Sequence, residues 1–281
     1  SSSSDAVDSS IVKNFKIEQV SLGCGSGKEL CDKRVGVLIN YFYRGNNNFN
    51  VNRCTASLIG EDVILTNNHC IVGFNNYVDG DVVKNMYFLP YGSEKAIKVQ
   101  SVIKTKKSYW MDYAKLRLSE KQPSYYDLES AGLNKSATAS VAVVNRRNWI
   151  SSKPYELVVD KIQRCRLIDK TTYYADTYNQ NKAGMALANC SVVGGNSGGP
   201  IFQNGKVVGV VYAYFNDLVR HLVENPSLKV LKRNGMKYSK KRITLATNAR
   251  CISDGGACDR ISLNNTPLRM AKMSARPLRV K

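Results

Sequence analysis

The segment at residues 194–200, GGNSGGP, contains a candidate nucleophile, Ser197. Glycines on both sides of the serine allow a tight, exposed turn that bulkier residues cannot adopt. Such a turn can direct several backbone N–H groups at one point, as an oxyanion hole requires. A serine hydroxyl is a weak nucleophile until an adjacent base accepts its proton. On the glycines alone, an ordinary turn is an equally good interpretation.

His69 is the candidate base. It lies in TNNHC (residues 66–70), directly after a run expected to be a strand and directly before Cys70. Cys54 lies one expected hairpin earlier, in CTASLI, so a Cys54–Cys70 bridge would fix the loop that carries His69. A lone histidine after a strand is more often an ordinary polar residue, and the adjoining cysteines are what favour a functional one. The second histidine, His221, is interpreted as a surface residue of an expected helix.

These two segments together resemble the chymotrypsin/trypsin-like serine protease family. In that family a Cys-Gly-Gly-Ser-Leu-Ile strand leads to Thr-Ala-Ala-His-Cys, and Gly-Asp-Ser-Gly-Gly-Pro follows later. The family order implies an aspartate between the histidine and the serine. Asp112 opens DYAKLRL, in which apolar and basic residues alternate as in a half-buried strand. Asp79, Asp81 and Asp127 are alternatives without that context.

The resemblance implies a role for each residue. Ser197 attacks the peptide carbonyl, His69 takes its proton and passes it to the leaving amine, and Asp112 orients His69. The N–H groups of Gly195 and Ser197 form the oxyanion hole. We therefore expect a serine endopeptidase that hydrolyses protein or peptide substrates through an acyl-enzyme intermediate. No metal or cofactor is expected, because the chain has 2 His and no Cys-x-x-Cys pair.

Substrate preference follows from the resemblance only in outline. The family places the base of the substrate pocket at Ser191, followed by Val192, and an aspartate there selects Lys or Arg. That preference is therefore disfavoured. The opposite wall falls at Val211 and Tyr214. Because Tyr214 stands where open pockets have glycine, we expect small or medium apolar side chains to fit best.

Asn196 departs from the family pattern, which has aspartate before the nucleophile. In members activated by cleavage, that aspartate pairs with a new Ile-Val-Gly-Gly terminus, whereas this chain has IVKN at residues 11–14. Asparagine carries no charge, so we expect activity without such a pair. The Gly-Asn-Ser-Gly-Gly-Pro segment is closer to bacterial members of the superfamily.

The chain has 8 cysteines, an even number that permits complete pairing. Disulfides indicate an oxidising compartment, and we expect a secreted or periplasmic protein without its signal peptide, although eight reduced thiols remain the alternative. The resemblance implies two pairs, and proximity in sequence suggests two more. In that order, the pairs are Cys54–Cys70, Cys165–Cys190, Cys24–Cys31 and Cys251–Cys258.

The formal net charge is +19, and residues 229–281, with 14 basic and 2 acidic residues, contribute +12 of it. The rest of the chain is only mildly basic. No zinc-finger spacing or aromatic RNA-binding signature accompanies the tail. A solvated basic face is one interpretation, and adhesion to an anionic surface or polyanion is the other. The second gives an alternative function, a catalytically silent protease-like protein that binds anionic surfaces through its basic tail.

Short apolar, β-branched runs separated by Asn, Gly, Ser and Asp predict an all-β protein. The resemblance implies two six-stranded antiparallel β-barrels, followed by a C-terminal helix at residues 217–231 and a basic extension. We expect an N-terminal leader at residues 1–32, a protease domain at 33–234 and the extension at 235–281. No apolar run is long enough for a transmembrane helix, and the oligomeric state is left open. The strand-length runs are 34–43, 54–59, 63–66, 82–89, 96–103, 113–118, 139–144, 156–163, 184–188 and 206–214.

Overall fold

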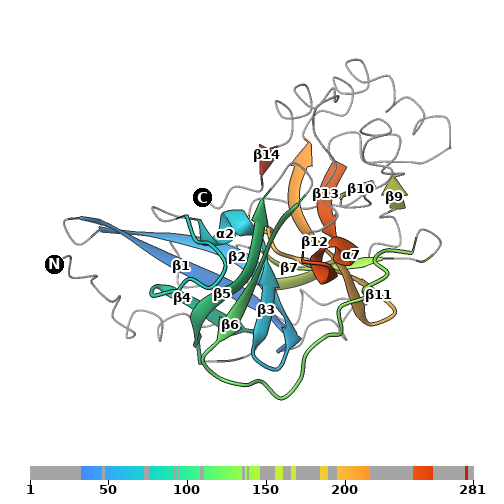
Figure 1. The fold of residues 1–281 in the computed structure, drawn as a ribbon. Coiled ribbons are helices and arrows are strands. Elements are labelled where there is room, and N and C mark those ends of the chain that lie inside the picture. The colour runs from blue at the N-terminus through green and yellow to red at the C-terminus, as the bar shows by residue number, and fades with distance from the viewer. Residues whose placement is uncertain are drawn as a thin grey trace.

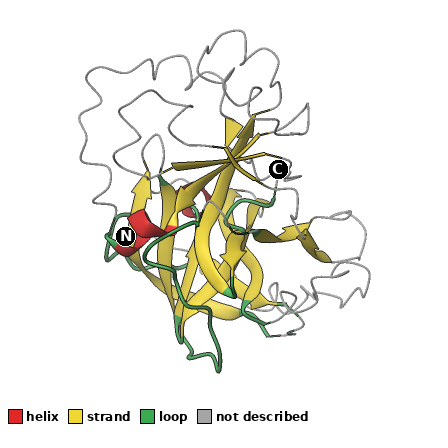
Figure 2. Ribbon diagram, turned by 90° about the vertical axis from the view of Figure 1, so that its right-hand side faces the viewer, coloured by secondary structure: helices red, strands yellow, loops and turns green. Residues whose placement is uncertain are grey.

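The structure, a computed structural model, consists mainly of β-strands, with two short helices in the part that it describes (Figure 2). Within that part, no helix is long and apolar enough to cross a membrane. The described residues are 33–45, 48–72, 76–91, 93, 95–107, 111–134, 137, 139–145, 156–160, 166–168, 184–188, 195–215, 243–255 and 276–277.

The first half of the chain forms a closed antiparallel barrel of six strands in the order β1-β2-β3-β6-β5-β4 (Figure 1). Helix α2 (Asn68–Ile71) follows β3 at the edge of the barrel. The six strands are β1 (Val35–Gly45), β2 (Asn48–Gly60), β3 (Val63–Thr66), β4 (Met86–Pro90), β5 (Ile97–Lys107) and β6 (Asp112–Leu118).

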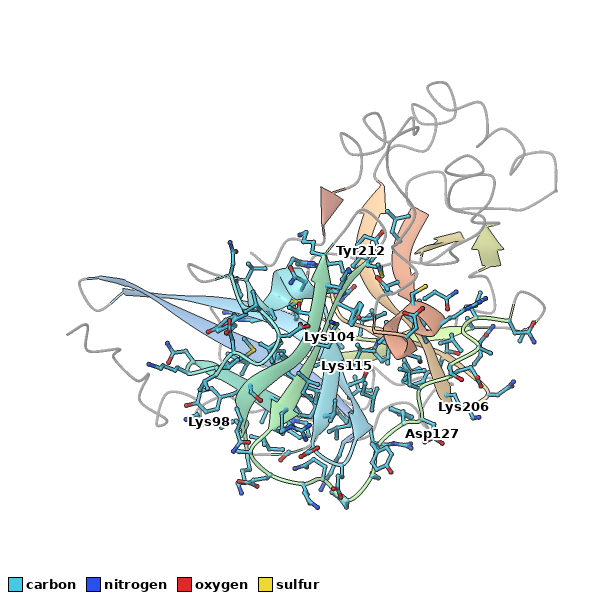
Figure 3. The ribbon with its side chains drawn as sticks, in the orientation of Figure 1. Lys98, Lys104, Lys115, Asp127, Lys206 and Tyr212 are labelled. Carbon is cyan, nitrogen blue, oxygen red and sulfur yellow. A yellow bond between two sulfur atoms is a disulfide. The ribbon has the colours of Figure 1, made fainter. Side chains whose placement is uncertain are left out.

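Alternation of side chains explains why these segments form a barrel with one filled interior. In β6, Ala114 and Leu116 are fully buried in the barrel core, whereas Lys115 and Arg117 between and after them are only partly buried. Lys115 lies opposite Lys104 of β5, and both are labelled on these strands in Figure 3. The core also contains Leu38, Leu58, Ile64, Ile71 and Phe88.

The second half forms an eight-stranded sheet in the order β8-β7-β11-β12-β13-β10-β9, with β14 also paired to β12. Helix α7 (Ala249–Ser253) follows β13. The strands are β7 (Ser140–Asn145), β8 (Glu156–Asp160), β9 (Arg166–Ile168), β10 (Gly184–Ala188), β11 (Pro200–Gln203), β12 (Lys206–Phe215), β13 (Ile243–Asn248) and β14 (Arg276–Pro277).

The all-β architecture and one closed six-stranded barrel confirm the expected fold class. The second unit is an open sheet in the described residues, so closure of a second barrel stays a prediction. The helix expected at residues 217–231 lies outside the described residues. Helix α7 is a different, later element that the sequence patterns did not predict. The domain boundary at residue 234 also stays a prediction, and β13, beyond it, lies between β12 and β10.

The connection between the two halves is held against the second sheet by one side chain of β11. Gln203 Nε2 donates to the carbonyls of Asn134 and Ala137 at 2.8 and 3.0 Å, and Gln203 Oε1 accepts from Asn134 N–H at 2.8 Å. Because Gln203 is buried, these bonds tie the connection firmly to β11.

Candidate active site

His69 lies in α2, directly after β3, and its position is fixed from two strands. The disulfide Cys54–Cys70 joins α2 to β2. The buried side chain of Asn40, on β1, donates through Nδ2 to the carbonyls of Cys70 and Ile71 at 3.3 and 3.4 Å. The short helix therefore cannot move without breaking contacts to both strands.

Asp112 opens β6, is buried, and receives two hydrogen bonds from His69. Its Oδ2 lies 2.6 Å from His69 Nδ1, and its Oδ1 accepts the His69 backbone N–H at 3.1 Å. Asn67, directly before α2, donates through Nδ2 to the Asp112 carbonyl at 2.7 Å. Because an ionised carboxylate can only accept, His69 Nδ1 carries the ring proton and donates it to Asp112. His69 Nε2 is therefore left as the acceptor.

Opposing effects set the protonation of Asp112. Burial by itself raises the pKa of this carboxyl, whereas its electrostatic interaction and its hydrogen bonds with His69 lower it. The Lys107 ammonium, 3.9 Å from Asp112 Oδ2, lowers the pKa further. The pKa of Asp112 is therefore below its ordinary value, and the group is an anion at neutral pH.

Ser197 approaches His69 from the second sheet, in the turn before β11. Its Oγ lies 2.9 Å from His69 Nε2, close enough to donate its proton to the ring. The turn has positive φ angles of +94° at Gly195 and +85° at Gly198. Residues other than glycine rarely adopt such angles. The glycines expected from the sequence are thus needed by the backbone of this turn.

Further contacts join the described residues of the two halves at this point. The Thr55 N–H of β2 donates to the Ser197 carbonyl at 2.8 Å, and the Asp112 N–H donates to Thr247 Oγ1 of β13 at 3.0 Å. A Cβ on Gly198 would meet the Thr55 carbonyl and the Thr66 hydroxyl. The serine can reach the histidine only because glycine lets the two halves approach this closely.

Comparison with known families agrees with this arrangement. The Trypsin family model matches residues 39–218, which is more than half of the chain. This chain belongs to the trypsin family. The comparison with curated proteins gives no match.

Solved structures show where the trypsin-family fold recurs. The scabies mite inactivated protease paralogue S-I1 is 15% identical, with a TM-score of 0.50 over 77% of this chain and 90% of that chain. The active form of the Rv3671c protease from M. tuberculosis is also 15% identical, with a TM-score of 0.49 over 88% of this chain and 91% of that chain. Family and fold support a protease that acts on protein or peptide substrates. Because one neighbour is an inactivated paralogue, the fold alone does not establish catalysis.

In this trypsin-family chain, His69, Asp112 and Ser197 come together as the motifs suggested. Gly195 lies in the same turn, partly exposed. Of the expected pocket residues, Val211 is fully buried in β12, and the backbone of Tyr214 continues that strand. Ser191 and Val192 lie outside the described residues.

Of the cysteines in the other expected pairs, the structure describes Cys251. Cys251, in α7, is disulfide-bonded. Its expected pairing stays a prediction, because the other cysteine lies outside the described residues. The cysteines outside are Cys24, Cys31, Cys165, Cys190 and Cys258.

Sequence reasoning missed three residues that contact Asp112: Asn67, Lys107 and Thr247. Asn67 stands where the family segment has alanine, so the departure from Thr-Ala-Ala-His-Cys was the available signal. Lys107 and Thr247 offered none, since both reach Asp112 from other strands. One Cys/His cluster, Cys54, His69 and Cys70, lies close enough for metal ligation among the described residues. Its two sulfurs form a disulfide, so they cannot act as thiolate ligands.

Proposed function

We propose that this chain is a serine endopeptidase that cleaves peptide bonds through His69, Asp112 and Ser197. The observation that carries the proposal is the unbroken series of hydrogen bonds from Asp112 Oδ2 through the His69 ring to Ser197 Oγ, at 2.6 and 2.9 Å. A buried anion, an oriented imidazole and a hydroxyl in this order are the parts that nucleophilic catalysis at a carbonyl requires.

The chemistry follows from these positions. His69 Nε2 takes the Ser197 proton as the oxygen attacks the substrate carbonyl, and the anionic Asp112 stabilises the resulting imidazolium. The imidazolium then protonates the leaving amine, which leaves an acyl-enzyme on Ser197. Water, activated by the same ring, hydrolyses the ester and returns the proton to Ser197.

The negative oxygen of the tetrahedral intermediate needs N–H donors, for which we propose Gly195 and Ser197. The positive φ of Gly195 supports this role, because it reverses the direction of the backbone at the start of the turn. Asn196 is fully buried and carries no charge. The turn therefore has no carboxylate that an N-terminal ammonium would pair with, and we expect Ile11→Ala to retain activity.

Labelling with a fluorophosphonate probe tests the proposal. The probe phosphonylates an activated serine, so the folded wild-type chain should be labelled at Ser197, and Ser197→Ala should not react. Ser119→Ala, at an exposed serine just after β6, is the matched control and should label as wild type. An intact, folded chain that stays unlabelled over hours would contradict the proposal.

The unlabelled outcome would favour the alternative of a silent protease-like protein that binds anionic surfaces. That alternative, the anionic partner of the basic tail and the secreted or periplasmic location all stay predictions. Substrate preference also stays a prediction, with small or medium apolar side chains favoured over Lys or Arg. Mass spectrometry of a cleaved peptide library would identify the preferred residue directly.

A further inference from the structure

On the side of the candidate nucleophile, β12 extends beyond the end of its pairing with β11. On one side, β13 pairs with β12 along its C-terminal half. On the other side, β11 pairs only as far as Val210. Val211 then bonds to the nucleophile turn, its N–H donating to Gly199 and its carbonyl accepting from Gly198, both at 2.9 Å. The part of this β12 edge beyond β11 therefore begins directly beside the turn that carries Ser197.

Strand β14 occupies this edge. It runs antiparallel to β12, with Arg276 opposite Tyr214 and Pro277 opposite Ala213. Because β13 already pairs with Ala213 and Tyr214 from one side, β14 lies on the other, where the nucleophile turn contacts Val211. Figure 1 shows β14 beside the end of β12. Proline is compatible with an edge strand, and β12 is the one strand that pairs with β14 among the described residues.

An extended substrate would need the same position. Peptides commonly bind by adding a strand to a sheet edge, through backbone hydrogen bonds that most sequences can make. A strand advances about 3.3 Å per residue, so a peptide paired at Ala213 is only about two residues from the level of Val211. From there its backbone continues toward Ser197, which must receive the scissile carbonyl. Tyr212, labelled in Figure 3, is the residue of β12 between these two points.

The burial of the catalytic groups agrees with an occupied site. Ser197 is 0% exposed, and the His69 side chain is 11% exposed. A substrate carbonyl must contact Ser197 Oγ directly, and the 0% exposure of this residue leaves no surface for that contact in this structure.

We propose that the segment carrying β14 is an intramolecular inhibitor that occupies the substrate-binding edge of β12. This inference rests on the proposed endopeptidase function. The described pairing covers two residues, so the affinity of the segment for β12 is low. Because the segment belongs to the same chain, however, it competes with substrate at an effective concentration on the order of millimolar. Inhibition is therefore reversible and competitive, and a substrate or partner that pairs better with the edge displaces the segment.

Arg276→Pro in the full chain tests the proposal. Of the two residues of β14, only Arg276 has a backbone N–H, so this substitution removes the one donor that the strand has. Losing this one hydrogen bond should lower KM for a peptide substrate by about 3- to 10-fold, with kcat unchanged. Fluorophosphonate labelling of Ser197 should accelerate by a similar factor.

Arg276→Ala is the matched control, because it removes the side chain but keeps the N–H. It should behave as wild type. A synthetic peptide of residues 272–281 should inhibit the Arg276→Pro chain competitively, and the same peptide carrying R276P should not.

Hydrogen exchange provides a readout that does not depend on catalysis. In the Ser197→Ala chain, the amide of Tyr214, which faces Arg276, should exchange faster once Arg276→Pro is added, whereas the amide of Ala213, which faces β13, should not change. Faster exchange without any labelling of either the wild-type or the Arg276→Pro chain would uphold the docked segment and refute the endopeptidase.

Three results would overturn the inhibitor. The first is unchanged KM and exchange in Arg276→Pro, and the second is an equal effect of Arg276→Ala. The third is loss of the segment by cleavage in the wild-type chain but not in Ser197→Ala, because a segment that is cut is a substrate.

Discussion

The barrel and the second sheet hold their parts of the candidate site in different ways. His69 and Asp112 lie in the same closed barrel, joined by two direct hydrogen bonds and by Asn67. Ser197 belongs to the sheet and is held against the barrel by a few contacts across the boundary, chiefly through Thr55. The base is therefore oriented within one folding unit, whereas the distance from base to nucleophile depends on how two units pack.

The largest effect should come from breaking the pair inside the barrel. Asp112→Asn keeps the shape but removes the charge and favours the wrong histidine tautomer, so kcat should fall by about 10⁴-fold while the fold is retained. Steady-state kinetics measures kcat, and circular dichroism shows whether the fold is retained. Asp79→Asn, at an exposed aspartate that pairs with Lys104 on the outer face, is the control and should stay within about twofold of wild type. An equal loss in both variants would show that Asp112 has no special role.

The next effect should come from separating the halves at Gly198. Gly198→Ala would place a Cβ against the Thr55 carbonyl at a positive φ, so the turn must retreat from the barrel. A displacement of about 1 Å should lower kcat about 100-fold. Chemical denaturation should also show a loss of several kcal/mol.

Gly205→Ala separates the two causes of that loss. Gly205 also has a positive φ, +73°, but an added Cβ there meets open space. The Gly205→Ala substitution should therefore lower the free energy of unfolding by only about 1 kcal/mol and leave kcat unchanged. Equal damage from both substitutions would show that backbone strain, rather than the approach of the halves, accounts for the result.

A smaller effect should come from the hydrogen bond between Asp112 N–H and Thr247. Thr247→Val keeps the volume and removes the acceptor, which leaves a buried N–H without this bond and should cost about 1–3 kcal/mol. We expect kcat to fall less than 10-fold, because His69 still holds the carboxylate. Thr247→Ser should restore both values, and no change in thermal denaturation of Thr247→Val would refute a role for the bond.

The smallest effect should come from Lys107, which is half-exposed and lowers the pKa of Asp112. A carboxyl whose pKa is lowered by folding adds stability above its unfolded pKa, and that stability is lost as pH falls through the folded pKa. Lys107→Met raises the folded pKa, so the midpoint of acid unfolding should move up by a few tenths of a pH unit at low salt. The shift should become smaller in about 1 M salt, because the Lys107 ammonium is half-exposed. Lys98→Met, at an exposed position of the same strand, is the control and should not shift the midpoint.

Local patterns predicted much of the barrel and the catalytic motifs. Strand β3 has the bounds expected from the run at residues 63–66, because a short apolar, β-branched run between turn residues is typical of a buried strand. The turn around Ser197 could also be predicted from the sequence, because its backbone conformation requires glycines. Strand β13 was missed, because ITLATN shows no clear alternation and is stabilised by neighbours on both sides. The pairing of β14 with β12 could not be predicted, because a two-residue strand has almost no local signal.

The sequence by itself determined the chemical groups: an imidazole after a strand, a serine among glycines, a carboxylate opening β6 and an asparagine where the family has a charge. The tertiary structure decided their distances, the contribution of Asn67 and Thr247 to holding Asp112, and which segment lies on the edge of β12. The reason is physical. Residue type and short periods determine what a segment can form, whereas contacts between distant segments depend on the packing of whole units and on the entropy of closing long loops.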